Sequence, residues 1–152
     1  MVRQPYQLVI AGRRYSDYQI PEKTVQDTGL KDHIRFIDNL PDTDLPSLYR
    51  GAEAFVLPSY YEGFGLPILE AMASSIPVVA TNCSSLPEVV GKAGLLVDPD
   101  DSEAIALALC KVISGGELRE HCIIAGLEQA RLFTWERCAR LTYKAYKEAL
   151  NR

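Results

Sequence analysis

Two glutamates, Glu62 and Glu70, enclose the seven residues GFGLPIL, which contain Gly63 and Gly65. Glycine lets backbone N–H groups approach a ligand closely. The pattern after Pro67 is helical, and the free N–H groups at the start of a helix add a partial positive charge. A glycine loop that leads into a helix therefore favours a site for a polar and anionic ligand.

The two carboxylates need a separate explanation. A carboxylate beside a bound phosphate would repel it, so Glu62 and Glu70 are interpreted as acceptors for hydroxyl groups. A ligand that carries both phosphates and many hydroxyls is a nucleotide sugar. The alternative is that Glu70 only complements the helix dipole and that Glu62 is a solvated loop charge. The strand, the glycine loop and the spaced pair together favour the functional interpretation.

An apolar run precedes this loop and an amphipathic pattern follows it. Residues 54–57, AFVL, predict a buried strand. Pro67 is tolerated in the first turn of a helix, because its missing N–H costs nothing there. Four apolar residues then share one helical stripe: Ile68, Leu69, Met72 and Ala73. The loop is therefore expected at the carboxyl end of a parallel strand, where ligands bind in open α/β sheets.

The rest of the chain alternates predicted strands with predicted helices. Further strands are expected at residues 7–11, where QLVIA predicts a buried strand, and at 33–37, 77–81 and 94–97. Helices are expected from about 16 to 28, from 44 to 50, from 86 to 90, after a cap within 98–101, after Gly116 and from Thr134 onward. This alternation predicts an α/β fold: a Rossmann-like doubly wound parallel sheet with helices on both faces and a helical C-terminal tail.

Serines and arginines at the ends of these elements leave alternatives open. Ser84 or Ser85 could cap the helix at 86–90, which is favoured over a ligand-facing role for their hydroxyls. Ser75 ends the helix that carries Glu70, where serine is less permissive than glycine, so the turn is either strained or not left-handed. Arg13 and Arg14 follow the first strand, and they either touch a phosphate or lie in a solvated loop.

Composition argues against several kinds of partner. The formal net charge of −4 argues against a nucleic-acid or anionic-membrane surface, which needs a basic face. No apolar run approaches the ~18 residues of a membrane span, and no signal peptide opens the chain. The four cysteines are widely spaced without a C-x-x-C pair. Cys110 and Cys122 fall among apolar helical positions, so small core residues in a reducing cytoplasm are expected, and no metal site is predicted.

The segment from Glu62 to Glu70 resembles the E-x7-E element of retaining glycosyltransferases with the GT-B fold, of the group 1 type, also called glycosyltransferase family 4. The resemblance covers nearly the whole chain in the family's order and spacing. It extends over residues 33–37, 44–49, 77–81, 86–89, 94–99 and 133–136.

This resemblance implies a role for each site residue. Glu70 would take the ribose hydroxyls of a nucleotide-diphosphate sugar, UDP- or GDP-linked, and Glu62, the catalytic candidate, would take a hydroxyl of the transferred sugar. The nucleotide base would lie against the backbone of Asn39 and Leu40. Sugar hydroxyls and phosphate would be held by the N–H groups of the four residues Gly63, Phe64, Gly65 and Leu66. The acceptor would attack from the same face, with retention and without a bound metal or other cofactor.

The resemblance also implies partners. Residues 1–152 would form a single donor-binding domain truncated at its N-terminal edge, with the acceptor-binding domain and a diphosphate-clamping Arg/Lys segment preceding Met1. This chain alone is then expected to be inactive. The apolar stripe of the last helix, which includes Trp135 and Tyr146, is expected to be exposed or covered in a homodimer. The parent enzyme is expected in the cytoplasm, where it either stays free or associates peripherally with the membrane. The alternative is a non-catalytic nucleotide-sugar-binding subunit, or a scaffold domain, that needs a separate partner chain.

Overall fold

The computed structural model describes residues 6–12 and 20–151, which divide after Ser47 into two compact units. Arg13 and Arg14 lie outside the described residues. The elements of the first unit are β1 (Leu8–Ala11), α1 (Ile20–Thr28), a 3-10 turn (Lys31–His33) and β2 (Ile34–Ile37), and α2 (Leu45–Arg50) spans the division. The second unit holds β3 (Phe55–Leu57), α3 (Leu66–Ala73), β4 (Val78–Thr81), α4 (Leu86–Val90), β5 (Gly94–Val97), α5 (Ser102–Ile113), α6 (Glu117–Arg131) and α7 (Trp135–Leu150).

In the first unit, β1 and β2 pair in parallel, with Leu8 opposite Ile34 and Ala11 opposite Ile37. Both predicted strands are therefore confirmed. The expectation that the first strand is buried is wrong, because Leu8 and Ile10 are 45% and 38% exposed. Among the described residues this sheet has two strands, so β1 has a hydrogen-bonded neighbour on one side only.

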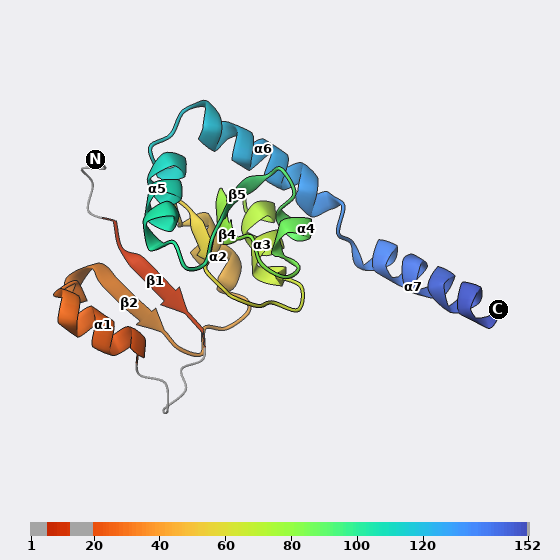
Figure 1. Ribbon diagram of the computed structural model, residues 1–152, viewed down its shortest axis with the longest axis horizontal. Helices are drawn as coiled ribbons and strands as arrows, with labels where there is room; N and C mark the ends of the chain where they lie inside the picture. The colour runs from red at the N-terminus through yellow and green to blue at the C-terminus, as the bar shows by residue number, and fades with distance from the viewer. Residues whose placement is uncertain (1–5, 13–19, 152) are drawn as a thin grey trace. The chain divides into compact units, whose positions relative to one another are not determined.

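The second unit is a parallel sheet in the order β3-β4-β5. All four residues of the central strand, β4, are buried. Its side chains alternate between two clusters, because successive residues of a strand point to opposite faces. Val78 and Ala80 pack with residues of α3 and α4, whereas Val79 packs with residues of α5 and with Cys122 of α6. Helices therefore cover both faces of the sheet (Figure 1), which confirms the predicted Rossmann-like α/β architecture. Cys122 is a core residue as expected, but the expectation for Cys110 is wrong, because its side chain is exposed.

Helix α3 is buried along Ile68, Ala71 and Met72, whereas Leu69 is half-buried and Ala73 is exposed. The predicted stripe was therefore wrong at Ala73. Helix α6 packs closely on α3 at Met72. A Cβ placed on Gly126 of α6 would lie 3.2 Å from Cγ of Met72, so glycine allows the close approach of the two helices.

The end of α3 is a left-handed turn. Ser75 has a φ of 63°. Its N–H donates to the carbonyl of Met72, and the N–H of Ile76 donates to that of Ala71. This pair of bonds is the Schellman arrangement, which normally takes glycine at the position of Ser75. The structure therefore selects the strained alternative for this turn.

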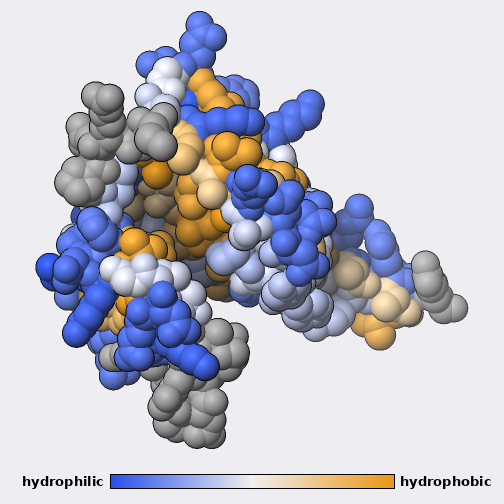
Figure 2. Space-filling view, turned by 60° about the vertical axis from the view of Figure 1, so that its left-hand side comes forward, coloured by the Kyte–Doolittle hydropathy of each residue, from blue (hydrophilic) through white to orange (hydrophobic). Residues whose placement is uncertain are grey.

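Helix α7 begins after Thr134, whose hydroxyl accepts a hydrogen bond from the N–H of Arg137, so the predicted start is confirmed. Its aromatic side chains are exposed: Trp135 is 82% and Tyr146 is 67% exposed. Figure 2 shows apolar atoms on the surface of this helix, at the right of the view. In the part of the chain that the structure describes, no helix has the length and apolar character needed to cross a membrane.

Candidate functional site

The glycine loop, residues 58–65, connects the carboxyl end of β3 to the start of α3. Gly65 has φ and ψ of 104° and 41°, a backbone conformation that residues with a Cβ rarely adopt. A Cβ on Gly65 would also lie 2.9 Å from Cδ2 of the fully buried Leu86. Gly63 is different, because a Cβ there would meet nothing within 4 Å. Gly65 therefore fixes the turn into the helix, whereas Gly63 borders open space.

Four consecutive backbone N–H groups at this turn are unused. Within the described residues, no hydrogen bond uses the N–H of Gly63, Phe64, Gly65 or Leu66. The neighbouring carbonyls are occupied, since that of Gly65 accepts from the N–H of Ile68 at 3.0 Å, and the carbonyls of residues 62 and 64 accept from Ser85. The loop and the first residue of α3 therefore offer four backbone donors to a ligand, at the positive end of the helix.

Glu62 is held at both its side chain and its backbone. Its Oε1 accepts a hydrogen bond of 2.8 Å from the hydroxyl of Ser59, and its N–H donates to Oγ of Ser84 at 3.0 Å. The carbonyl of Ser59 in turn accepts from Oγ1 of Thr81, a fully buried residue at the end of β4. The half-buried carboxylate keeps its second oxygen available as an acceptor, so it can bind a hydroxyl group.

Ser84 and Ser85 do not cap α4 as predicted. Ser85 occupies the N-cap position, but its side chain makes no capping hydrogen bond. Its Oγ instead lies 3.0 Å from the carbonyl of Glu62 and 2.9 Å from that of Phe64. The hydroxyls turn to the glycine loop because β3 and β4 are paired in parallel, so the loops that follow them lie at the same sheet edge.

Glu70 lies one turn into α3 and is exposed. Its Oε2 accepts a hydrogen bond of 2.9 Å from the hydroxyl of Tyr49. The ring of Tyr49 packs edge-on against Phe55, with centroids 5.7 Å apart. Burial, then the hydrogen bond to Glu70 and the charge of that carboxylate, raise the pKa of Tyr49 above its ordinary value. Tyr49 therefore stays a hydrogen-bond donor at neutral pH and fixes the orientation of Glu70.

The remaining candidate residues are placed as follows. Asn39 and Leu40 lie in the first unit, between β2 and α2, and Asn39 has a φ of 51°. In the second unit, the ring of Phe64 packs edge-on against Phe133 with centroids 5.7 Å apart. Within that unit, Glu62 and Glu70 lie at the two ends of the segment 62–70, and the four unused N–H groups lie between them.

Sequence reasoning missed Tyr49 and the loop-holding role of Ser84 and Ser85. The serines carried a usable signal, since hydroxyl residues follow a strand that neighbours β3. Tyr49 carried none, because no residue type beside it indicates that its hydroxyl meets a carboxylate of another helix.

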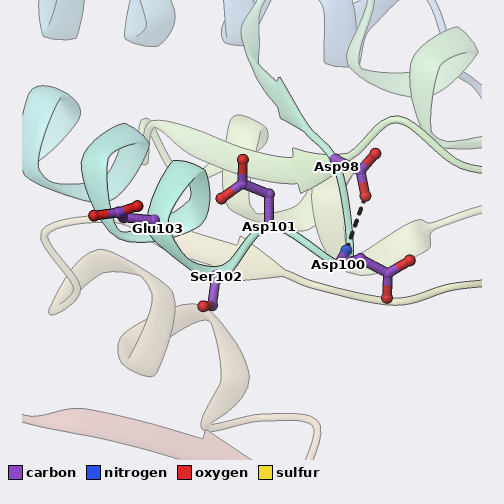
Figure 3. Close-up of a pocket in the computed structure, with 5 residues that line it drawn as sticks. All are labelled: Asp98, Asp100, Asp101, Ser102 and Glu103. Atoms are coloured by element: carbon purple, nitrogen blue, oxygen red, sulfur yellow. Dashed lines mark hydrogen bonds between the residues drawn. The ribbon is translucent and has the colours of Figure 1, made fainter.

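A separate acidic hollow lies at the turn from β5 to α5 (Figure 3). It is lined by Asp98, Asp100, Asp101, Ser102 and Glu103. Asp98 accepts a hydrogen bond from the N–H of Asp100, and Asp101 accepts one from the N–H of Ala104, which confirms the predicted cap. The carboxylates thus stabilise the turn, and their charge disfavours a phosphate here. No described cluster of three or more His, Cys, Asp or Glu side chains suits a metal ion.

Tyr60 joins the glycine loop to this acidic turn. Its hydroxyl donates to Oδ1 of Asp100 at 2.8 Å. That hydrogen bond, together with the negative charge of Asp100, raises the pKa of Tyr60. The loop after β3 is therefore tied both to the loop after β4 and to the turn after β5.

Comparison with known proteins gives consistent matches. A family model described as glycosyl transferases group 1 matches residues 2–129. The O-antigen chain mannosyltransferase B of Escherichia coli is 45% identical over 145 residues, which covers 95% of this chain and 38% of that protein. This chain therefore spans well under half the length of that relative.

Solved structures show the same similarity. Sucrose-phosphate synthase from Thermosynechococcus elongatus matches with a TM-score of 0.84 and 30% identity, over 95% of this chain and 39% of that one. The C-terminal domain of a glycosyl transferase group 1 family protein from Francisella tularensis matches with a TM-score of 0.67 and 29% identity, over 84% of this chain and 85% of that one.

Proposed function

The chain belongs to the glycosyl transferases of group 1 and has the Rossmann-like fold of one half of a GT-B enzyme, and from this premise we propose that it binds the nucleotide-sugar donor of a retaining hexosyltransferase. The observation that carries the proposal is the run of four unused N–H groups from Gly63 to Leu66, which lies at the positive end of α3 and has a glutamate on either side in the sequence. Donors of this kind bind phosphate and hydroxyl oxygens, and the carboxylates bind hydroxyl hydrogens.

The proposal assigns one group of the donor to each part of the site. Glu70, oriented by Tyr49, accepts hydrogen bonds from the ribose hydroxyls. Glu62, held by Ser59 and the serines that follow β4, accepts one from a hydroxyl of the transferred sugar. The backbone at Asn39 and Leu40 receives the base. The relative named as a mannosyltransferase, at 45% identity, supports a hexose as the transferred group.

In the proposed reaction, the bond between the anomeric carbon and the diphosphate oxygen breaks, and negative charge grows on the leaving diphosphate. The free N–H groups and the helix start offset that charge without reorganising, because they are already oriented. An acceptor hydroxyl attacks the anomeric carbon from the same face, so that configuration is retained, and its proton passes to the leaving phosphate. Glu62 keeps the sugar in position throughout and forms no covalent bond. Residues beyond this chain would supply the acceptor site.

A ligand panel on the 152-residue chain tests the proposal. Thermal unfolding would be followed with UDP, GDP, ADP and their common sugar conjugates at millimolar concentration, for wild type, Glu70→Ala and a control, Glu128→Ala, on an exposed position of α6. A ligand at one hundred times its Kd stabilises the folded state by about 2.7 kcal/mol.

The expected result is a rise in Tm with the nucleotide and sugar conjugates of one base, retained in the control and lost in Glu70→Ala. Two results would overturn the proposal: no rise with any ligand in wild type, or an undiminished rise in Glu70→Ala. The base that gives the rise would distinguish a UDP-linked from a GDP-linked donor.

A further inference from the structure

Ser84 keeps an unfavourable backbone conformation at the edge of the site. Its φ is 48°, in the left-handed region where glycine is favoured, because there the Cβ of any other residue crowds the following carbonyl oxygen. Ser84 is exposed, so close packing does not require a side chain at this position. Strain of this kind persists where a specific contact maintains it.

The contact that Ser84 makes is with the backbone of Glu62. Its Oγ accepts the N–H of Glu62 at 3.0 Å, across 22 residues of sequence. This is the last N–H before the run of four unused ones, so Ser84 determines where that run begins. The hydroxyl of Ser85 engages the carbonyl of the same residue, and both backbone groups of Glu62 are thereby fixed.

On the basis of the proposed function, we infer that Ser84 is a positioning residue for the donor sugar. Its hydroxyl holds the backbone of Glu62 so that the carboxylate, also bonded to Ser59, meets the hydroxyl of the transferred sugar. Glycine would relieve the backbone strain and lose this bond. Ser84 thus has two separable effects: its backbone strain lowers stability, and its hydroxyl positions Glu62.

Two substitutions separate these effects. Ser84→Gly removes both the hydroxyl and the strain, whereas Ser84→Ala removes the hydroxyl and keeps the strain. A matched control is Ser75→Gly, because Ser75 is a second serine with positive φ and lies at the far end of α3 from the loop. Affinities would be measured by calorimetry for the nucleoside diphosphate and for its sugar conjugate, with Tm recorded for every variant.

If Ser84 positions Glu62, both of its variants bind the sugar conjugate about tenfold more weakly, the factor that corresponds to one hydrogen bond of ordinary strength. Their affinity for the nucleoside diphosphate changes less, because Glu62 contacts the sugar. This loss is expected although Ser84→Gly has the higher Tm of the two. Ser75→Gly is expected to bind both ligands as wild type does. Affinity for the conjugate that follows Tm, with Ser84→Gly equal to wild type, would overturn the inference.

A second measurement needs no ligand. Amide hydrogen exchange would be followed at Glu62 in wild type and in the three variants. Protection of this amide is expected to fall in both Ser84 variants and to stay unchanged in Ser75→Gly. Unchanged protection in both Ser84 variants would overturn the inference directly. If wild type shows the protection pattern but binds no nucleotide sugar, the proposed function fails while the contact between Ser84 and Glu62 stands.

Discussion

Replacement of Gly65 by alanine isolates the turn on which the site is built. At this position the backbone has a φ of 104°, and a Cβ would lie 2.9 Å from Cδ2 of Leu86 and 3.6 Å from Cδ1 of Ile68. Both neighbours are fully buried in the core between the sheet and α3. A methyl group at Gly65 must therefore displace Leu86, move the loop, or do both.

The expected loss of stability has three contributions. The left-handed conformation costs alanine about 1–2 kcal/mol relative to glycine. Insertion of a methyl group against well-packed Leu86 costs about 1–3 kcal/mol. The smaller conformational freedom of alanine in the unfolded chain returns about 0.4–1 kcal/mol. The net expectation is a decrease of about 3 kcal/mol in the free energy of unfolding, or a Tm lower by roughly 10 °C.

Urea unfolding followed by circular dichroism measures this difference, because a common slope allows midpoints to be compared directly. Fluorescence of Trp135 is a poorer probe, since this side chain is 82% exposed and lies outside the core. Gly63→Ala is the matched control: it lies two residues away, where a Cβ meets nothing within 4 Å, and is expected to change stability by less than about 0.5 kcal/mol. Equal stabilities of the two variants would refute the argument that the turn at Gly65 requires glycine.

Four further substitutions have defined outcomes. Ser75→Gly should raise the free energy of unfolding by about 1 kcal/mol, because it relieves a φ of 63°, and urea midpoints equal to wild type would contradict this. The pKa of Tyr49 is raised in the folded protein, so on raising the pH this side chain ionises first in the unfolded chain. The stabilisation that its neutral hydroxyl provides is therefore complete below pH about 10 and declines above it. Between pH 10 and 11 the free energy of unfolding should fall less in Tyr49→Phe than in wild type. Arg119→Ala should cost about 2 kcal/mol, because Nη1 donates to two backbone carbonyls. Nη2 of Arg119 also pairs with the carboxylate of Glu53 at 3.0 Å, but that side chain is 56% exposed, so Glu53→Ala should cost less than about 1 kcal/mol. Equal losses in urea unfolding of the two variants would contradict the view that the bonds to the carbonyls matter more than the ion pair.

The sequence was sufficient where local chemistry decides the structure. The apolar run before the glycines and Pro67 after them predicted the strand, the loop and the start of α3, since each signal acts over a few residues. The cap at Asp101 and the start of α7 at Thr134 were predictable for the same reason. The residue types and the family resemblance together selected the two glutamates and the loop between them. The structure places this loop after the carboxyl end of β3, with Glu70 one turn into the helix that follows.

What the sequence could not predict depends on which segments become neighbours. Ser84 and Ser85 have good capping residue types, and only the parallel pairing of β3 with β4 turns their hydroxyls toward the glycine loop. Tyr49 meets Glu70 for a similar reason, through packing against Phe55. Exposure of β1 also depends on neighbours, because an apolar strand is buried only where other elements cover it.

The two ends of the edge of the β3-β4-β5 sheet carry opposite polarity, and this difference favours one orientation of a ligand. The loop after β3 presents N–H donors, and the turn after β5 presents the carboxylates of Asp98 and Asp100, with the hydroxyls after β4 between them in the strand order. A diphosphate is attracted to the first and repelled by the last. A sugar, which is neutral and rich in hydroxyls, is accepted by carboxylates. For the nucleotide sugar proposed above, this charge pattern favours placement of the diphosphate at the donor-rich loop and of hydroxyl groups at Glu62 and Glu70.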